Sequence, residues 1–270
     1  MEQNFDLKPF FENLNLPQDD SHKGQNGKLL IIGGSDLFHA ASRWSLDVAS
    51  KFVDMLFYSS TPENNQLIKE AKQNFWNGIV IEEKDRDSYA MEADVILIGP
   101  GMTRTDDTKQ AIDELIKKFP DKKMVIDAGA LQMVDPMLLN KNHIITPHKK
   151  EILTLVEKIP DNSIDQLLEN GVTILLKSKV DEVVVRDHYY EIRGGNSGMT
   201  KGGTGDVLSG LVAAIYCKTD SLASAVVGSY INKKAGDALY EFVGPFFNST
   251  DLVNAVPEVF WGEYKKFTGK

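Results

Sequence analysis

Residues 198–206 read Gly-Met-Thr-Lys-Gly-Gly-Thr-Gly-Asp and run directly into Val207–Tyr216, which has the apolar pattern of a helix. Four of these nine residues are glycines. Glycines let backbone N–H groups approach an anion closely, and the start of the following helix adds the positive end of a dipole. The stretch therefore predicts an anion-binding loop at the N-terminus of a helix.

Asp206 ends this loop, at the first turn or cap of the predicted helix. A carboxylate there can accept a proton from a reacting hydroxyl group, beside an anion hole that suits a transferred phosphoryl group. The alternative is a glycine turn followed by an N-cap aspartate. The length and composition of the loop favour the functional interpretation. The loop is not a Walker A motif, and no Gly-x-Gly-x-x-Gly follows the first expected strand.

Short apolar runs and amphipathic stretches alternate before the loop. We expect strands at Lys28–Ile32, Met55–Tyr58, Gly78–Val80, Val95–Ile98, Met124–Ile126, His143–Thr146, Thr173–Lys177 and Asp181–Val185. We expect helices at Ala40–Phe52, Thr105–Phe119, Lys150–Val156 and Ser163–Asn170, then at Val207–Tyr216, Leu222–Tyr240 and Asp251–Tyr264. The alternation predicts an α/β layered fold with a largely parallel central sheet and a helical C-terminal third.

Glycines and polar residues follow four of these strands. The strand ends continue into Gly33-Gly34-Ser35, Gly99-Pro100-Gly101, Asp127-Ala128-Gly129 and Thr146-Pro147-His148. Ligands of open α/β sheets bind at the carboxyl ends of the strands. We therefore expect one shared cleft there.

The bulk composition bounds the class of protein. The 270 residues carry a net charge of −9, which disfavours nucleic acid as a partner, and residues 1–270 are interpreted as a single domain. The single cysteine, Cys217, permits no internal disulfide and fits a reducing cytoplasm. No apolar run approaches the roughly 18 residues of a membrane span. Lysine pairs such as Lys233–Lys234 have acids nearby and are interpreted as solvated faces.

Residues 195–210 closely resemble the signature of the ADP/ATP-dependent NAD(P)H-hydrate dehydratases, a branch of the ribokinase-like superfamily. Other segments agree with that family in order, and the resemblance spans roughly residues 15 to 262. They are His22-Lys23-Gly24 with Leu30–Ser35, Ala93–Val95 with Gly99–Gly101, Val125–Ala128, Thr146–His148 with Glu151, and Ser249–Leu252. Several ordered motifs are more specific than any one of them.

The resemblance implies a ribokinase-like fold and repair of hydrated NADH or NADPH (NADHX or NADPHX). ADP or ATP would phosphorylate the hydroxyl group of the hydrate, and phosphate would then be eliminated, with Mg²⁺ bridging the nucleotide phosphates. It also suggests a homo-oligomer, such as a tetramer. The epimerase domain that often accompanies this family is not expected, because the first strand begins near Lys28.

The same resemblance assigns roles residue by residue. Asp206 would be the base, and the loop residues Gly203, Thr204 and Gly205 would hold the phosphoryl group. The hydrate site would comprise Ala41, Gly101, His148 and Asp206. The adenine nucleotide would contact Gly205 and the segment Lys177, Ser178, Lys179, Val180 and Asp181. Glu151 would orient the metal, directly or through water, or would be a first-turn acid favoured by the helix dipole.

Two departures from the family pattern lie at expected ligand positions. Lys149-Lys150 replaces the usual Pro-Gly before Glu151, and Ser178 and Asp181 replace a glycine and a threonine. A carboxylate at position 181 would repel a phosphate unless a metal or Lys179 offsets it. The alternatives are therefore a small-molecule kinase of the same superfamily, acting on a sugar or vitamin, and a nucleotide-binding member with little activity. Phe242, Phe246 and Phe247 are interpreted as packing residues.

Overall fold

The computed structural model describes residues 5–270. Within this range, the strands form one sheet in the order β3-β2-β1-β4-β5-β6-β7-β8-β9. Their bounds are β1 Lys28–Ile32, β2 Met55–Ser59, β3 Ile79–Val80, β4 Val95–Ile98, β5 Lys123–Ile126, β6 His143–Ile145, β7 Thr173–Leu176, β8 Asp181–Val185 and β9 His188–Ile192. The pairs from β3 to β7 are parallel, whereas β7, β8 and β9 pair antiparallel. The predicted α/β fold with a largely parallel sheet is confirmed.

Helices flank the sheet and account for most of the C-terminal third. They are α1 Lys8–Glu12, α2 His39–Ala49, α3 Pro62–Ala71, α4 Arg86–Glu92, α5 Asp106–Lys118, α6 Ala128–Met133, α7 Lys149–Val156, α8 Asp165–Glu169, α9 Thr204–Tyr216, α10 Ser221–Val243 and α11 Ser249–Thr268. The structure adds three-residue and four-residue 3₁₀ turns at Glu83–Asp85, Pro136–Leu138 and Ser197–Thr200. The last of these overlaps the start of the glycine-rich loop.

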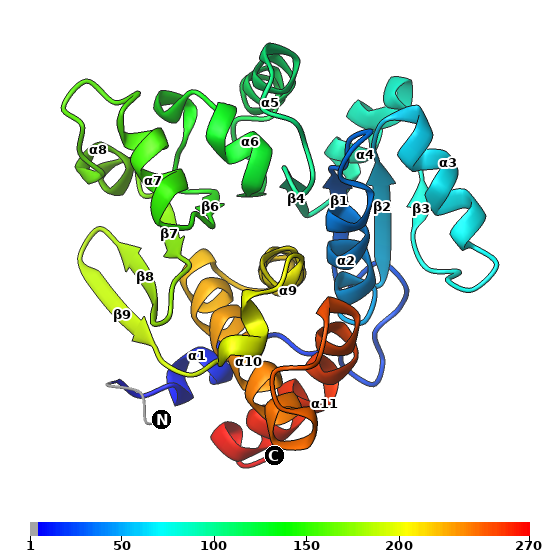
Figure 1. The fold of residues 1–270 in the computed structure, drawn as a ribbon, viewed down its shortest axis with the longest axis vertical. Coiled ribbons are helices and arrows are strands. Elements are labelled where there is room, and N and C mark those ends of the chain that lie inside the picture. The colour runs from blue at the N-terminus through cyan, green and yellow to red at the C-terminus, as the bar shows by residue number, and fades with distance from the viewer. Residues whose placement is uncertain (1–4) are drawn as a thin grey trace.

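Helices lie on both faces of the sheet (Figure 1), and the buried apolar residues form two clusters, one on each face. Along β1, Leu29 and Ile31 join one cluster, while Leu30 and Ile32 join the other. The alternation follows from the period of two residues in a strand and explains why both faces of this strand are apolar. The first cluster also contains residues of α2, α9, α10 and α11, and the second contains residues of α4 to α8.

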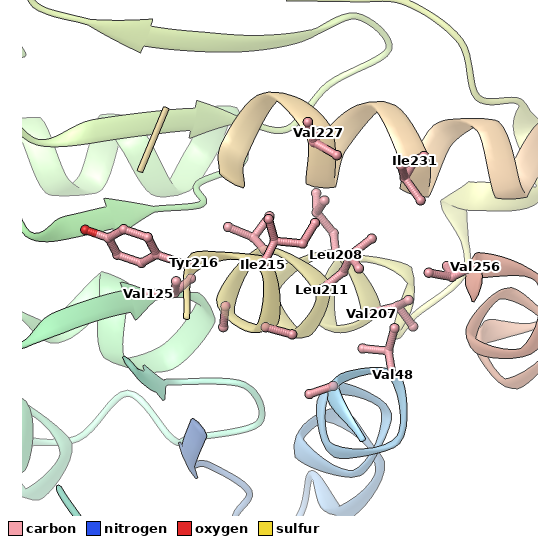
Figure 2. Packing of buried hydrophobic residues seen from close by; sticks show 14 of the residues in the cluster. Val48, Val125, Val207, Leu208, Leu211, Ile215, Tyr216, Val227, Ile231 and Val256 are labelled. Atoms are coloured by element: carbon pink, nitrogen blue, oxygen red, sulfur yellow. The ribbon is translucent and has the colours of Figure 1, made fainter. Parts of the chain in front are cut away.

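Helix α9 lies in the middle of the first cluster (Figure 2). Its apolar residues pack against Val227 and Ile231 of α10, and the same cluster includes Val48 of α2, Val125 of β5 and Val256 of α11. Nearly every residue of α9 is buried, which explains its composition: a helix enclosed on all sides needs apolar residues around its whole circumference. This packing fixes the position of its N-terminus, where the glycine-rich loop ends.

The order of the strands reverses at β1, which pairs with both β2 and β4. Strands β2 and β3 follow on one side of β1, and β4 to β9 follow on the other. Since the strands from β1 to β7 are parallel, their carboxyl ends share one edge, as the sequence predicts. Strand β9 and helices α1, α3, α4 and α6 are additional to the predicted elements. Of the three phenylalanines interpreted as packing residues, Phe247 is buried, but Phe242 and Phe246 are 87% and 86% exposed, so that interpretation is wrong for these two.

Candidate active site

A cavity of about 850 Å³ opens at the carboxyl edge of the sheet. Its walls come from the ends of β5, β6 and β7, from the glycine-rich loop, from the N-terminus of α9 and from one side of α10. Among the residues singled out from the sequence, those lining it are Asp127, His148, Lys177, Ser178, Lys179, Asp181, Gly203, Thr204, Gly205 and Asp206. The structure thus brings the predicted loop and the predicted nucleotide segment to one cavity.

Several side chains hold the glycine-rich loop in its shape. The hydroxyl of Thr204 donates to Met199 O at 2.8 Å, and that of Ser249, at the start of α11, donates to Gly202 O at 2.9 Å. Lys201 Nζ donates to Pro245 O at 2.6 Å and to Phe247 O. The loop lysine is therefore engaged with the connection between α10 and α11.

Gly203 is the N-cap of α9 and has a φ of +98°, a conformation that side chains disfavour. A Cβ atom at this position would lie 2.3 Å from the ring of Trp44 on α2. Two constraints thus require glycine at this position: the positive φ of the backbone and the close approach of α2. Ser45 of the same helix donates a hydrogen bond to Asp206 O at 2.8 Å, which further fixes the start of α9.

The start of α9 offers unpaired amide N–H groups. Thr204 N donates to Lys201 O and Val207 N to Gly203 O. Within residues 5–270, no protein acceptor is found for the amides of Gly205 and Asp206. Free amides at a helix N-terminus attract anions through both hydrogen bonds and the helix dipole. This geometry can hold a phosphoryl group beside the Asp206 side chain.

The Asp206 carboxyl has an unusual proton affinity. Burial raises its pKa to about 7, the carboxylates of Asp127 and Glu151 add to the rise, and the ammonium of Lys177 opposes it. A carboxyl with a pKa near neutrality can both take up and release a proton at physiological pH, as a general base must.

Lys177 and Asp127 form an ion pair in the wall of the cavity, with 2.7 Å between Nζ and Oδ1. Burial disfavours the charge on the lysine, but the carboxylates of Asp127, Glu151 and Asp206 outweigh this effect and raise its pKa. A Cβ atom on Gly205 would lie 3.6 Å from Lys177 Nζ. The ammonium group is thus positioned beside the start of α9, where it can meet an anion held by the loop.

The carboxylate of Asp181 is held in a network of protein donors. Its Oδ1 accepts from Ser178 N at 2.8 Å and its Oδ2 from the Ser229 hydroxyl at 2.8 Å. Lys233 Nζ lies 3.3 Å from Oδ1. The offsetting cation is therefore Lys233, where the sequence suggested a metal or Lys179.

The interpretation of the pair Lys233–Lys234 as a solvated face is wrong for Lys233, because this side chain is only 6% exposed. Its Nζ also donates to the carbonyls of Ser178 and Lys179, each at 3.2 Å. Sequence reasoning missed it, although a lysine inside the Ala/Ser/Gly-rich stretch of α10 was an available signal. Val180, the remaining residue of the nucleotide segment, accepts a hydrogen bond from the Ser178 hydroxyl through its carbonyl oxygen.

His148 and Glu151 cap α7 reciprocally. His148 Nδ1 accepts from Lys150 N and Glu151 N at 3.1 and 3.2 Å, and Glu151 Oε2 accepts from His148 N at 2.8 Å. Since Nδ1 is an acceptor, the ring proton of the neutral imidazole is on Nε2. Glu151 Oε1 accepts from Gln132 at 3.0 Å, so both carboxylate oxygens already have protein donors. The first-turn role of Glu151 is thus evident, and its metal role stays a prediction.

Ala41 and Gly101 lie next to each other, outside the set of residues that line the cavity. A Cβ atom on Gly101 would lie 3.1 Å from the Ala41 Cβ and 3.2 Å from Gly34 Cα. Gly34 N donates to Pro100 O at 2.7 Å, which joins the turns that follow β1 and β4. These residues form a second part of the same sheet edge, at the point where the strand order reverses.

A largely parallel sheet with a glycine-rich loop at the start of a buried helix is the arrangement of the ribokinase-like fold. An *Enterococcus faecalis* ribokinase-like protein matches with a TM-score of 0.83 at 22% identity, covering 96% of this chain and 95% of that one. The *Bacillus subtilis* ADP/ATP-dependent NAD(P)H-hydrate dehydratase, crystallised with ATP and Mg²⁺, matches with a TM-score of 0.77 at 20% identity, covering 96% and 97%. These matches establish the ribokinase-like fold.

The chain belongs to the NAD(P)H-hydrate dehydratase family, whose model matches residues 29–258. The ADP-dependent (S)-NAD(P)H-hydrate dehydratase of *Nitrosopumilus maritimus* is 32% identical over 262 residues, covering 88% of this chain and 90% of that protein. The bifunctional NAD(P)H-hydrate repair enzyme of *Methanocaldococcus jannaschii* is 34% identical over 247 residues. That match covers 89% of this chain and 49% of the relative, so the chain spans about half the length of this bifunctional protein. The resemblance given by the sequence motifs is confirmed.

Proposed function

We propose that this protein dehydrates hydrated NADH or NADPH with ADP or ATP as the phosphoryl donor. Family membership supports the substrate class, and the dehydratase of *N. maritimus* is named as ADP-dependent. The observation that carries the proposal is the position of the Asp206 carboxyl, with a pKa of about 7, beside the free amides at the start of α9. A base and an anion hole are the two elements that phosphoryl transfer to a hydroxyl group needs.

In this proposal Asp206 accepts the proton of the hydrate hydroxyl as its oxygen attacks the terminal phosphorus. The bond from that phosphorus to the bridging oxygen breaks and releases AMP from ADP, or ADP from ATP. The C–O bond of the phosphorylated hydrate then breaks, phosphate leaves and loss of a ring proton restores the reduced nicotinamide. Within the predicted anion hole of Gly203, Thr204 and Gly205, the free amide of Gly205 binds the negative charge of the transferred group, together with the free amide of Asp206 and the ammonium of Lys177.

We assign the other predicted contacts to two parts of the same sheet edge, one for the nucleotide and one for the hydrate. Lys177–Asp181 and Gly205 would hold the nucleotide, while His148 Nε2–H, Ala41 and Gly101 would face the hydrate. Mg²⁺ usually takes one or two carboxylates together with phosphate oxygens and water. Among the residues described, no three His, Cys, Asp or Glu side chains are grouped to hold a metal. We expect the nucleotide phosphates to supply most ligands of Mg²⁺, with Glu151 as the predicted protein carboxylate, directly or through water.

We further propose a homo-oligomer in the cytoplasm, in line with the family and with the single cysteine. In the part of the chain that the structure describes, no helix is long and apolar enough to cross a membrane.

The decisive experiment is incubation with NADHX, Mg²⁺ and either ADP or ATP, followed by the absorbance of reduced nicotinamide. The wild type should restore that absorbance, and Asp206→Asn should lose at least about 100-fold in rate. Asp187→Asn, on the exposed turn between β8 and β9, is the matched control and should retain full activity. Full activity in Asp206→Asn would refute the assigned base. A stable phosphorylated product without elimination would instead identify a small-molecule kinase.

A further inference from the structure

Asn232 is a buried polar residue in the wall of the cavity. It is 4% exposed, lies on α10 and lines the cavity together with Lys233. Its Oδ1 atom is enclosed and has no hydrogen-bond partner among the described residues. Buried amide oxygens are nearly always paired, because leaving one unpaired costs about 1–3 kcal/mol. An unpaired amide in a cavity wall therefore indicates a ligand that supplies the missing donor.

The contacts of neighbouring residues place Asn232 at the nucleotide end of the cavity. Lys233 donates to the carbonyls of Ser178 and Lys179, and Ser229 donates to Asp181. Positions 229, 232 and 233 share one face of a helix, since residues three and four apart are neighbours. That face of α10 is fastened to the segment 178–181, so Asn232 is held beside the segment expected to bind the nucleotide.

The chemistry of the unpaired atom selects which part of a nucleotide it meets. An amide oxygen is an acceptor and requires a donor. Phosphate groups of ADP and ATP offer acceptors almost exclusively at neutral pH. The donors of these nucleotides are the amino group of adenine and the hydroxyls of ribose. Since the oxygen is enclosed within the protein, contact with such a donor requires the Asn232 amide to turn about its Cβ–Cγ bond toward the cavity.

We propose that the Asn232 amide oxygen accepts a hydrogen bond from the nucleoside half of the bound nucleotide and so determines nucleoside specificity. The inference rests on the proposed nucleotide dependence and adds a residue that the sequence motifs do not include. Glycines 203 and 205, Lys177 and Asp206 then serve the phosphoryl end, while Asn232 serves the nucleoside end.

A thermodynamic cycle tests this proposal. Binding of ADP, of purine riboside diphosphate (which lacks the amino group) and of 2′,3′-dideoxy-ADP (which lacks the ribose hydroxyls) is measured by calorimetry on the full chain. Asn232→Leu should weaken ADP binding about 5- to 10-fold, the worth of one hydrogen bond. One of the two analogues should bind the wild type more weakly by a similar factor and lose nothing further in the variant. That analogue identifies the donor as adenine or ribose.

If Asn232 had a purely structural role, its replacement would lower the melting temperature of the protein. The proposal predicts no such loss. Because the Asn232 oxygen has no partner in the protein, Leu at this position should leave the melting temperature of the nucleotide-free protein unchanged or raise it. Asn232→Ala serves the same cycle if leucine proves too large, and Asn254→Leu on the exposed side of α11 is the matched control. Equal losses for all three ligands, or no loss for ADP, would overturn the proposal. Failure of the wild type to bind ADP and ATP would overturn the proposed function as well, whereas hydrate turnover without coupling at Asn232 would overturn this inference alone.

Discussion

Lys177 Nζ lies 2.7 Å from Asp127 Oδ1, and the pair joins the carboxyl ends of β5 and β7 next to the start of α9. An ammonium group has three donors, and the contact with Asp127 uses one of them. The others remain for a phosphate at the loop. Since Asp127 and Lys177 also act on the pKa of Asp206 in opposite directions, Lys177 and the proposed base belong to one electrostatic unit.

The pH dependence of the wild type follows from this unit. Only the ionised form of Asp206 can accept a proton, and burial raises its pKa to about 7. We therefore expect kcat/KM to rise with pH through about 7, since this ratio reports the pKa values of the free enzyme. A pH–rate profile from pH 5 to 9 measures it. A profile that is flat across neutrality would contradict the assignment of Asp206.

Asp127→Asn should move that acidic limb to lower pH. The substitution removes a carboxylate that raises the pKa of Asp206 and leaves the opposing ammonium of Lys177 in place. The nucleotide KM should also rise, because Lys177 loses its anchor. Asp187→Asn provides the control, with an unchanged limb. An upward shift of the limb in Asp127→Asn would show that Lys177, once released, no longer acts on Asp206.

Asp206→Asn should be more stable than the wild type at pH 8 although it is inactive. The folded state binds the proton of Asp206 more tightly than the unfolded state, whose carboxyl keeps the ordinary pKa. This preference stabilises the fold at low pH and is lost as the pH rises through about 7. We expect a gain of about 1–3 kcal/mol at pH 8 that disappears near pH 4. Denaturant titrations at both pH values provide the measurement, and equal stability at pH 8 would refute the raised pKa.

Gly203→Ala and Gly202→Ala form a matched pair within the loop. Alanine at 203 would have to adopt a φ of +98° and would place its Cβ 2.3 Å from the Trp44 ring, whereas a Cβ at 202 meets nothing within 4 Å. Gly203→Ala should lose about 2 kcal/mol or more of stability and most of the activity, whereas Gly202→Ala should change stability by less than about 1 kcal/mol. Urea denaturation and the hydrate assay measure both. Similar behaviour of the two variants would argue against the geometry described for the loop.

The sequence predicts the fold well because its strands are buried on both faces. A short, continuous apolar run such as Val95–Ile98 is typical of a strand that is buried on both faces. The predicted bounds of this strand match the structure. Strand β9 was not predicted because its residues are mostly exposed or half-buried, so it lacks such an apolar run. Helix α3 was missed for a related reason, since it is polar along most of its length.

Part of the candidate site could likewise be predicted from the sequence, and part could not. The glycine loop and Asp206 are contiguous, so their chemistry is visible in the sequence. The partnership of Asp181 with Lys233 joins positions 52 residues apart, and the pattern along α10 does not distinguish Lys233 from the neighbouring Lys234. Which of two adjacent lysines is buried depends on the rotation of α10 against β8, and only tertiary packing sets that rotation.

That rotation yields the last prediction, a comparison of Lys233→Met with Lys234→Met. Lys233 is 6% exposed and pairs with the buried carboxylate of Asp181, so its removal leaves a buried charge without its cation. We expect Lys233→Met to cost about 3 kcal/mol or more of unfolding free energy and to weaken ADP binding, because the carbonyls of Ser178 and Lys179 lose their donor. Lys234→Met should change either quantity little. Adding Asp181→Asn to Lys233→Met should restore part of the stability, since it removes the unpaired charge. The amide oxygen can still accept from Ser178 N, and the amide NH2 group can donate to the Ser229 hydroxyl oxygen. Denaturation of the wild type, Asp181→Asn, Lys233→Met and the double variant in one buffer measures the coupling, and additive losses would show that the two charges do not stabilise each other.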